Sequence, residues 1–189
     1  QSQRGGGWVT SALSARLAAA GEVEVVYELA ERRRARDLYE RLQLSALWRD
    51  NDQIMRTKEH GRMVHSLEYV RTMLPDTESA LILLDAGEHG SAGTALILTK
   101  QSLTSYPLPS AETVSPTIRR LVARLESGQQ EGPDAAHLGA ALLAGAMPVL
   151  EKEGIRRLVL LPEGVLNRVP FDVLRLDGRY VAERFQTAV

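Results

Sequence analysis

Few side chains in this sequence could do chemistry, and the most reactive type is missing. The chain has no cysteine in 189 residues, which excludes disulfides, thiolate metal sites and a thiol nucleophile together. Its four histidines are scattered, and none lies four residues from another, as a pair of metal ligands on a helix would. We interpret all of them as surface or ordinary packing residues: His60, His65, His89 and His137.

The serines and carboxylates form no stronger pattern. The sequence has no Gly-x-Ser-x-Gly, the turn that exposes a nucleophilic serine in α/β hydrolases. Glu163, Asp172 and Asp177 lie near expected turns, but nothing pairs them in a way that would shift a pKa. The turn Pro162-Glu163-Gly164 has a single glycine and lacks the Lys-Ser/Thr of a phosphate-binding loop. We predict no catalytic, cofactor-binding or metal-binding residue, and no enzymatic activity for the chain alone.

A basic cluster, RRRAR at residues 32–36, has two interpretations. It could form an anion-binding face on a helix. Alternatively, it is a solvated face that pairs with acidic residues one helical turn away, each pair contributing about 0.2–0.5 kcal/mol. We favour the second interpretation because the sequence offers opposite charges at this spacing: Glu28–Arg32, Arg33–Asp37, Arg36–Glu40 and Asp37–Arg41.

The composition is that of an ordinary globular domain, with 44% hydrophobic and 25% charged residues. A net charge of −1 produces no field that would draw the chain onto nucleic acid or an anionic membrane. No apolar run approaches the ~20 residues that a membrane span needs. We therefore expect a cytoplasmic protein without nucleic-acid or membrane partners.

Two helices are predicted at the start of the chain. Apolar residues recur at three- and four-residue spacing from Trp8 to about residue 20, where Gly21 ends the pattern, and a longer pattern follows over residues 22–50. Such an αα-hairpin is the unit of helical repeat proteins, and it must stack on something to bury its apolar face. Residues 51–63 are polar and ambiguous, and Ser66 then offers an N-cap for a short helix that stops at Pro75-Asp76.

Strands are predicted at residues 80–84 and 94–99, as a hairpin, and at residues 156–161. Both runs of the hairpin are almost wholly apolar, which is typical of a sheet covered on both faces. Residues 104–108 fit an edge strand, since prolines limit its pairing. Between the hairpin and the last strand we expect one helix capped by Ser115 with Pro116 in first position, and another capped by Asp134 with a restart near Met147. Residues 174–176 and 180–189 are expected to pair through Asp177-Gly178.

Three segments resemble one protein family. Residues 162–174, PEGVLNRVPFDVL, closely resemble the loop PDG-x-L-N-x-(L/V)-P-F-x-x-L of the CHAT family, caspase-like peptidases commonly found behind TPR repeats. Residues 30–38, AERRRARDL, are similar to the helix A-E-R-x-R-A-R-x-L that links those repeats to the CHAT domain. Residues 142–150 are similar to the motif L-L-x-P-L of the same family. Glu163 stands where the family more often has Asp. The resemblance covers about residues 27–185.

The resemblance implies an α/β fold: a helical hairpin, the TPR-like end, followed by part of a caspase-like sheet with helices on both faces. Residues 1–64 are then the TPR-like and linker region, and residues 65–189 the N-terminal half of the CHAT domain. In that family the catalytic His and Cys come later, so the chain is expected to be the non-catalytic N-terminal portion of a caspase-like cysteine peptidase. It would supply strands and couple upstream repeats to a catalytic part located after Val189.

The partners implied are the C-terminal continuation, or a second chain, that carries the His/Cys dyad, and a protein bound through the upstream repeats. An alternative is a catalytically inactive, CHAT-derived scaffold for protein interactions. An unrelated nucleotide-binding α/β domain is disfavoured because the chain lacks the glycine-rich loop such a domain needs.

Overall fold

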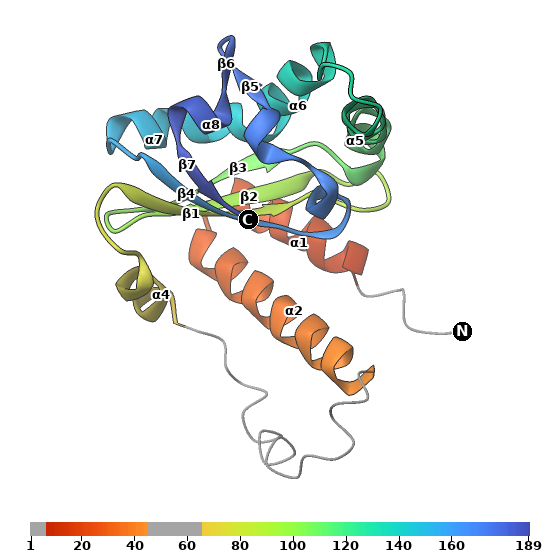
Figure 1. The fold of residues 1–189 in the computed structure, drawn as a ribbon. Coiled ribbons are helices and arrows are strands. Elements are labelled where there is room, and N and C mark those ends of the chain that lie inside the picture. Colours follow the sequence, from red (N-terminus) through yellow and green to blue (C-terminus); the bar gives the residue numbers. More distant parts are fainter. Residues whose placement is uncertain (1–6, 45–65) are drawn as a thin grey trace.

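The computed structural model describes residues 7–44 and 66–189. They form a mixed α/β fold in which helices cover both faces of a five-stranded sheet (Figure 1). The strands of this sheet are β1 (Ser79–Asp85), β2 (Gly93–Leu98), β3 (Leu103–Leu108), β4 (Arg157–Pro162) and β7 (Gln186–Ala188). The longer helices are α1 (Gly7–Ala19), α2 (Val23–Leu44), α4 (Leu67–Met73), α5 (Ala111–Glu126), α6 (Pro133–Leu143) and α7 (Met147–Lys152).

The sheet combines an antiparallel half with a parallel half, in the order β3-β2-β1-β4-β7. β1 pairs antiparallel with β2, and β2 with β3, as predicted for a hairpin followed by an edge strand. β4 pairs parallel with β1 on one side and with β7 on the other, which confirms that it is an interior strand. The outer edge of β7 pairs with no other strand in the described ranges.

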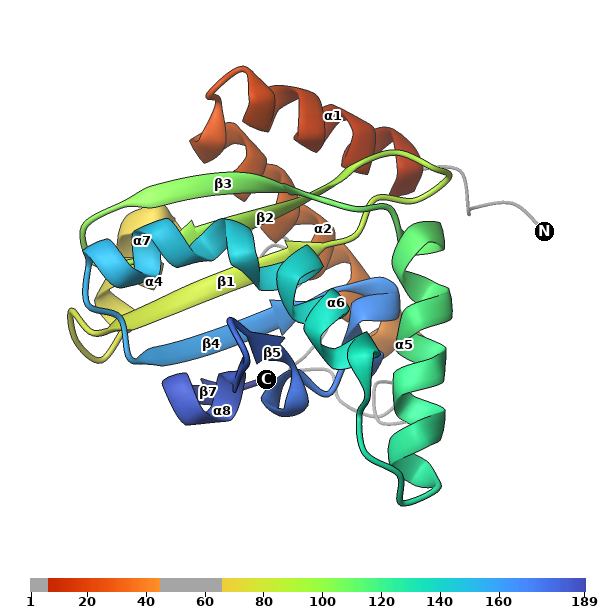
Figure 2. The same ribbon diagram turned by 90° about the horizontal axis from the view of Figure 1, so that it is seen from above.

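The central strands are buried on both faces, as their nearly continuous apolar sequences predict. In β1, Ile82 and Leu84 pack on one side of the sheet with α5, α6 and α7, while Leu81 and Leu83 pack on the other with α2. Figure 2 looks onto the sheet, with α6 and α7 in front of the strands and α2 behind them. The result is a three-layer arrangement with the core divided by the sheet.

The helical hairpin packs on the sheet itself. Gly21, with φ +83°, makes the turn between α1 and α2, because a left-handed backbone favours glycine. Val26 and Tyr27 of α2 are buried against strand residues such as Leu83, so the five-stranded sheet buries the hairpin's apolar face. Residues 45–65 lie outside the described residues. They include the end of the helix predicted over residues 22–50 and the predicted boundary between the helical region and the CHAT-like part, at residues 64 and 65.

Two predicted caps of the second helical layer are wrong by a few residues. α5 begins at Ala111, because Ser110 is its N-cap and accepts a hydrogen bond from the Thr113 N–H (3.3 Å), so that Pro116 lies inside the helix. α6 begins at Pro133, after Gly132, and Asp134 lies in its first turn. The predicted restart near Met147 is confirmed: a 3₁₀ turn, η3 (Ala144–Ala146), joins α6 to α7.

The end of the chain differs from the single strand predicted over residues 180–189. β5 (Arg175–Leu176) and β6 (Arg179–Tyr180) form a short hairpin through Asp177 and Gly178, both with positive φ, which is the predicted turn. The chain then makes one helical turn, α8 (Val181–Arg184), in which Glu183 accepts a hydrogen bond from the Tyr180 N–H. This turn redirects the chain, and β7 joins the large sheet instead of extending the hairpin.

Candidate functional site

Two carboxylates lie side by side where the central parallel strands end. Leu84 of β1 and Pro162 of β4 are opposed in the parallel register, and Asp85 and Glu163 are the residues that follow them. The N–H of Glu163 donates to the carbonyl of Leu84 at 2.9 Å, which holds the turn after β4 against the end of β1. In open α/β sheets this carboxyl edge is where functional groups gather.

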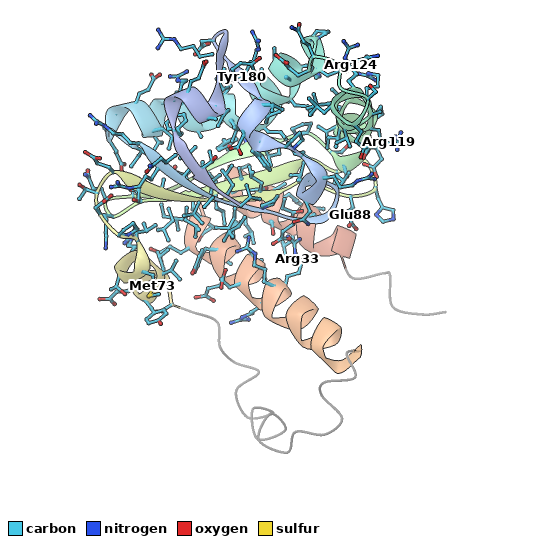
Figure 3. All side chains as sticks on the ribbon, in the orientation of Figure 1. Arg33, Met73, Glu88, Arg119, Arg124 and Tyr180 are labelled. Atoms are coloured by element: carbon cyan, nitrogen blue, oxygen red, sulfur yellow. The ribbon has the colours of Figure 1, made fainter. Side chains whose placement is uncertain are left out.

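Arg33 of α2 joins these two carboxylates. Its guanidinium donates to Asp85 Oδ2 at 2.8 Å and forms an ion pair with Glu163 Oε2. Ser11 of α1 also donates to Asp85 Oδ2, at 3.2 Å. Figure 3 labels Arg33 in the space between α2 and the sheet. Four elements, α1, α2, β1 and β4, therefore meet at one polar junction.

Arg34 binds the other side of the same glutamate. Its Nε donates to Glu163 Oε1 at 3.1 Å, its Nη2 to the carbonyl of Leu161 at 3.2 Å, and its Nη1 to Glu31 Oε1 at 3.4 Å. Both carboxylate oxygens of Glu163 are thus bound by arginines. We call Ser11, Arg33, Arg34, Asp85 and Glu163 the edge cluster.

The edge cluster is partly shielded from water, since its arginine and carboxylate side chains are 18–25% exposed. Burial lowers the pKa of Arg34, and the nearby Glu31 carboxylate opposes that shift. Burial, together with Glu31, raises the pKa of Tyr27 to about 12. Arg34 remains a cation at neutral pH because the guanidinium starts from a pKa above 12.

The prediction of a solvated, self-paired basic face is right for Arg32, but Arg33 and Arg34 are largely shielded from solvent and bind carboxylates of the sheet edge, although Arg34 also pairs with Glu31 of its own helix. Arg32 pairs with Glu28 at 3.5 Å in solvent. Arg33 and Arg34 instead lie three and four residues after Ala30, so they continue the helix face that packs on the sheet. That spacing is the signal which sequence reasoning missed. The side chains of Arg36, Asp37, Glu40 and Arg41 lie outside the described residues.

A small cavity of about 20 Å³ lies behind the edge cluster, between α2 and the sheet. Arg33, Asp85 and Glu163 form its polar side, and Val26 is among its apolar lining. Thr94 of β2 also lines it, and the Thr94 hydroxyl is buried without a hydrogen-bond partner among the described residues. The volume is of the order of one water molecule, which is too small for an organic substrate.

The other residues considered from the sequence lie apart from this junction. His89 and His137 are exposed, and His60 and His65 lie outside the described residues. Asp177 pairs with Arg184 at 3.2 Å. Asp172 is exposed and accepts a hydrogen bond from Thr187. Of the three carboxylates singled out near turns, the structure brings only Glu163 into the edge cluster.

The edge cluster can bind elements together, but the Ser11 hydroxyl donates to Asp85 and no histidine belongs to the cluster to activate it as a nucleophile. Guanidinium donors already bind the carboxylates of Asp85 and Glu163, so neither is placed to accept a proton from a substrate. In the described ranges no three His, Asp or Glu side chains are arranged to hold a metal ion. The arrangement favours a structural or coupling role.

No protein-family model and no curated protein sequence matches this chain. No helix in residues 7–44 or 66–189 is long and apolar enough to cross a membrane.

Proposed function

We propose that this chain is the non-catalytic N-terminal portion of a caspase-like cysteine peptidase of the CHAT type, and that it acts in the cytoplasm. In this role β1, β4 and β7 are the first parallel strands of the peptidase sheet. The helical hairpin is the TPR-like end that couples upstream repeats to it. The His and Cys of the catalytic dyad come from a continuation of the chain or from a second polypeptide.

One observation carries this proposal: two of the segments that resemble the family contact each other. Arg33 and Arg34 lie in the linker-helix motif, and Glu163 lies in the PEG motif, about 130 positions away in the sequence. The two motifs meet at the carboxyl edge of the parallel strands. This arrangement is expected if the linker helix influences a site at that edge. The three-layer fold is also compatible with a caspase-like sheet.

The alternative is an inactive scaffold for protein interactions. The edge cluster favours it, because its carboxylates are already bound by arginines. In both proposals the chain alone performs no peptide hydrolysis, and they differ in whether a partner supplies the thiol.

Incubation of the purified chain with a panel of fluorogenic peptides tests the common prediction, which is turnover no higher than in buffer. Turnover that survives further purification and resists thiol alkylation would contradict it. Co-expression with the coding region that follows residue 189 separates the two proposals. Thiol-dependent turnover by the complex supports the peptidase, and stable association with no turnover supports the scaffold.

A further inference from the structure

We propose that the edge cluster is a conformational switch: it couples the position of α2 to the conformation of the turn that follows β4, residues 163–168. This inference depends on the proposed function only in taking α2 as the side that receives the signal. The coupling itself is a property of the described residues.

The charges of the edge cluster are divided between the two sides that would move. Both cations, Arg33 and Arg34, belong to α2, whereas Asp85 ends β1 and Glu163 opens the turn after β4. Withdrawal of α2 would leave Asp85 and Glu163 as unneutralised like charges at the ends of two adjacent strands. Because like charges repel, departure of α2 would favour a displacement of the turn that carries Glu163 away from Asp85.

The turn is built so that a shift of Glu163 would be transmitted. Glu163 precedes the 3₁₀ turn η4 (Gly164–Arg168), and its carbonyl accepts from the Leu166 N–H at 3.1 Å. Gly164 has φ +57°, a conformation in which glycine permits backbone rearrangement at little steric cost. Consecutive 3₁₀ turns, η4 and η5 (Phe171–Val173), have weaker hydrogen-bond geometry than an α-helix.

The junction between α2 and the sheet contains a gap in its packing. The cavity lies directly behind Arg33 and Glu163, and the Thr94 hydroxyl beside it has no partner among the described residues. The buried apolar contacts of α2, Val26 and Tyr27, come about two turns before the arginines. Because close-packed interiors resist displacement, a gap at this place lowers the cost of moving α2.

Hydrogen–deuterium exchange of the whole chain tests the switch, with Glu163→Gln as the variant that removes the charge and keeps the size. We expect exchange to become about tenfold faster in two segments at once, residues 23–34 and 163–168, since a hydrogen bond to a charged group is worth about a factor of ten or more. Glu131→Gln is the matched control. Glu131 is 13% exposed and pairs with Arg175 at 2.8 Å on the opposite face of the sheet.

Faster exchange in residues 163–168 with α2 unchanged within twofold would overturn the switch, as would equal effects of the two variants on α2. If Glu163→Gln does not fold, Arg34→Lys is used. It keeps the charge but loses the donors to Glu163 and Leu161, and it should affect the same two segments more weakly. Exchange confined to α2 in this variant would also overturn the proposal.

These measurements are independent of peptidase activity. A coupled change in both segments, together with no turnover in any complex, would keep the switch and remove the proposed peptidase. If the two segments respond independently and the complex is active, the switch is overturned and the proposed peptidase is supported.

Discussion

At the scale of single residues, the edge cluster combines a desolvation cost with several charge-assisted hydrogen bonds. Burial lowers the pKa of Arg34, yet Arg34 makes hydrogen bonds to Glu163, Leu161 and Glu31. Partly buried ion pairs contribute to specific geometry more reliably than to net stability. Two other polar residues of the fold allow sharper single-residue predictions.

Thr94→Val should leave the free energy of unfolding unchanged or raise it by about 1 kcal/mol. The Thr94 hydroxyl is buried without a partner among the described residues, and a valine of similar volume removes an uncompensated polar group. Thr99→Val is the matched control, because the Thr99 hydroxyl accepts from the N–H groups of Gln101 (3.1 Å) and Ser102 (2.8 Å). The control should lose about 1–3 kcal/mol in urea denaturation. Equal losses in both variants would contradict the prediction.

Asp76 should make stability depend on pH in the acid range. Its hydrogen bonds from Arg157, then from Ser79, lower the pKa of the carboxyl from 3.8 to about 2 in the folded state. Because the folded pKa is below the unfolded one, the stabilisation is complete above about pH 4 and is lost as the pH falls toward 2.

The free energy of unfolding, measured from pH 6 to pH 2, should therefore differ between wild type and Asp76→Asn at the upper end and converge at the lower end. Glu126→Gln, at an exposed carboxylate, is the control. A difference between wild type and Asp76→Asn that stays constant down to pH 2 would show that the Arg157 pair has no effect on stability.

At the scale of elements, β4 is the strand on which the sheet depends. It pairs with β1 and β7, and its Leu158 and Leu160 are buried under the α5–α7 layer. The turn that ends β4 carries Glu163, so the same strand supports the core and places the edge cluster. Damage to β4 should consequently affect the whole domain.

Leu160→Asp should unfold the domain. Leu160 is fully buried opposite Ile82 of β1, and an unpaired carboxylate there costs several kcal/mol against a typical total stability of about 5–15 kcal/mol. Gln186→Asp, at an exposed position of β7, is the control and should retain the wild-type circular dichroism spectrum. An unchanged melting temperature for Leu160→Asp would be incompatible with an interior strand.

At the scale of the whole molecule, the helical hairpin and the sheet share a core. α1 and α2 cover the face of the sheet opposite α5, α6 and α7, and Val26, Tyr27 and strand residues form one apolar cluster (Figure 1). A hairpin attached in this way should not unfold separately from the sheet.

Val26→Ala should shift the entire unfolding transition and cost about 1–3 kcal/mol, because Val26 is only 2% exposed. Its neighbour Val25 is 43% exposed, so Val25→Ala is a matched control with little expected effect. Calorimetry should give a single transition with equal calorimetric and van't Hoff enthalpies in both variants. A separate low-temperature transition for the hairpin would show that it is an independent unit.

The sequence by itself determined the elements whose signals are local. Apolar runs predicted β1, β2 and β4, Ser66 predicted the cap of α4, and Asp177-Gly178 predicted the β5–β6 turn. Each depends on side chains close together in the chain, where spacing and turn chemistry are sufficient. The errors at the starts of α5 and α6 are also local, because the N-caps are Ser110 and Gly132, a few residues before the predicted caps Ser115 and Asp134.

Only the tertiary structure decided the contacts between distant segments. The parallel pairing of β7 with β4 depends on the helical turn α8. Four residues, Val-Ala-Glu-Arg, are too few for their spacing to distinguish a helical turn from a strand. The edge cluster depends on α2 packing against the sheet with Arg33 and Arg34 facing Asp85 and Glu163. Local charge spacing predicted a self-paired helix, and the stronger effect was the continuation of the buried helix face, which brings both arginines to carboxylates remote in the sequence.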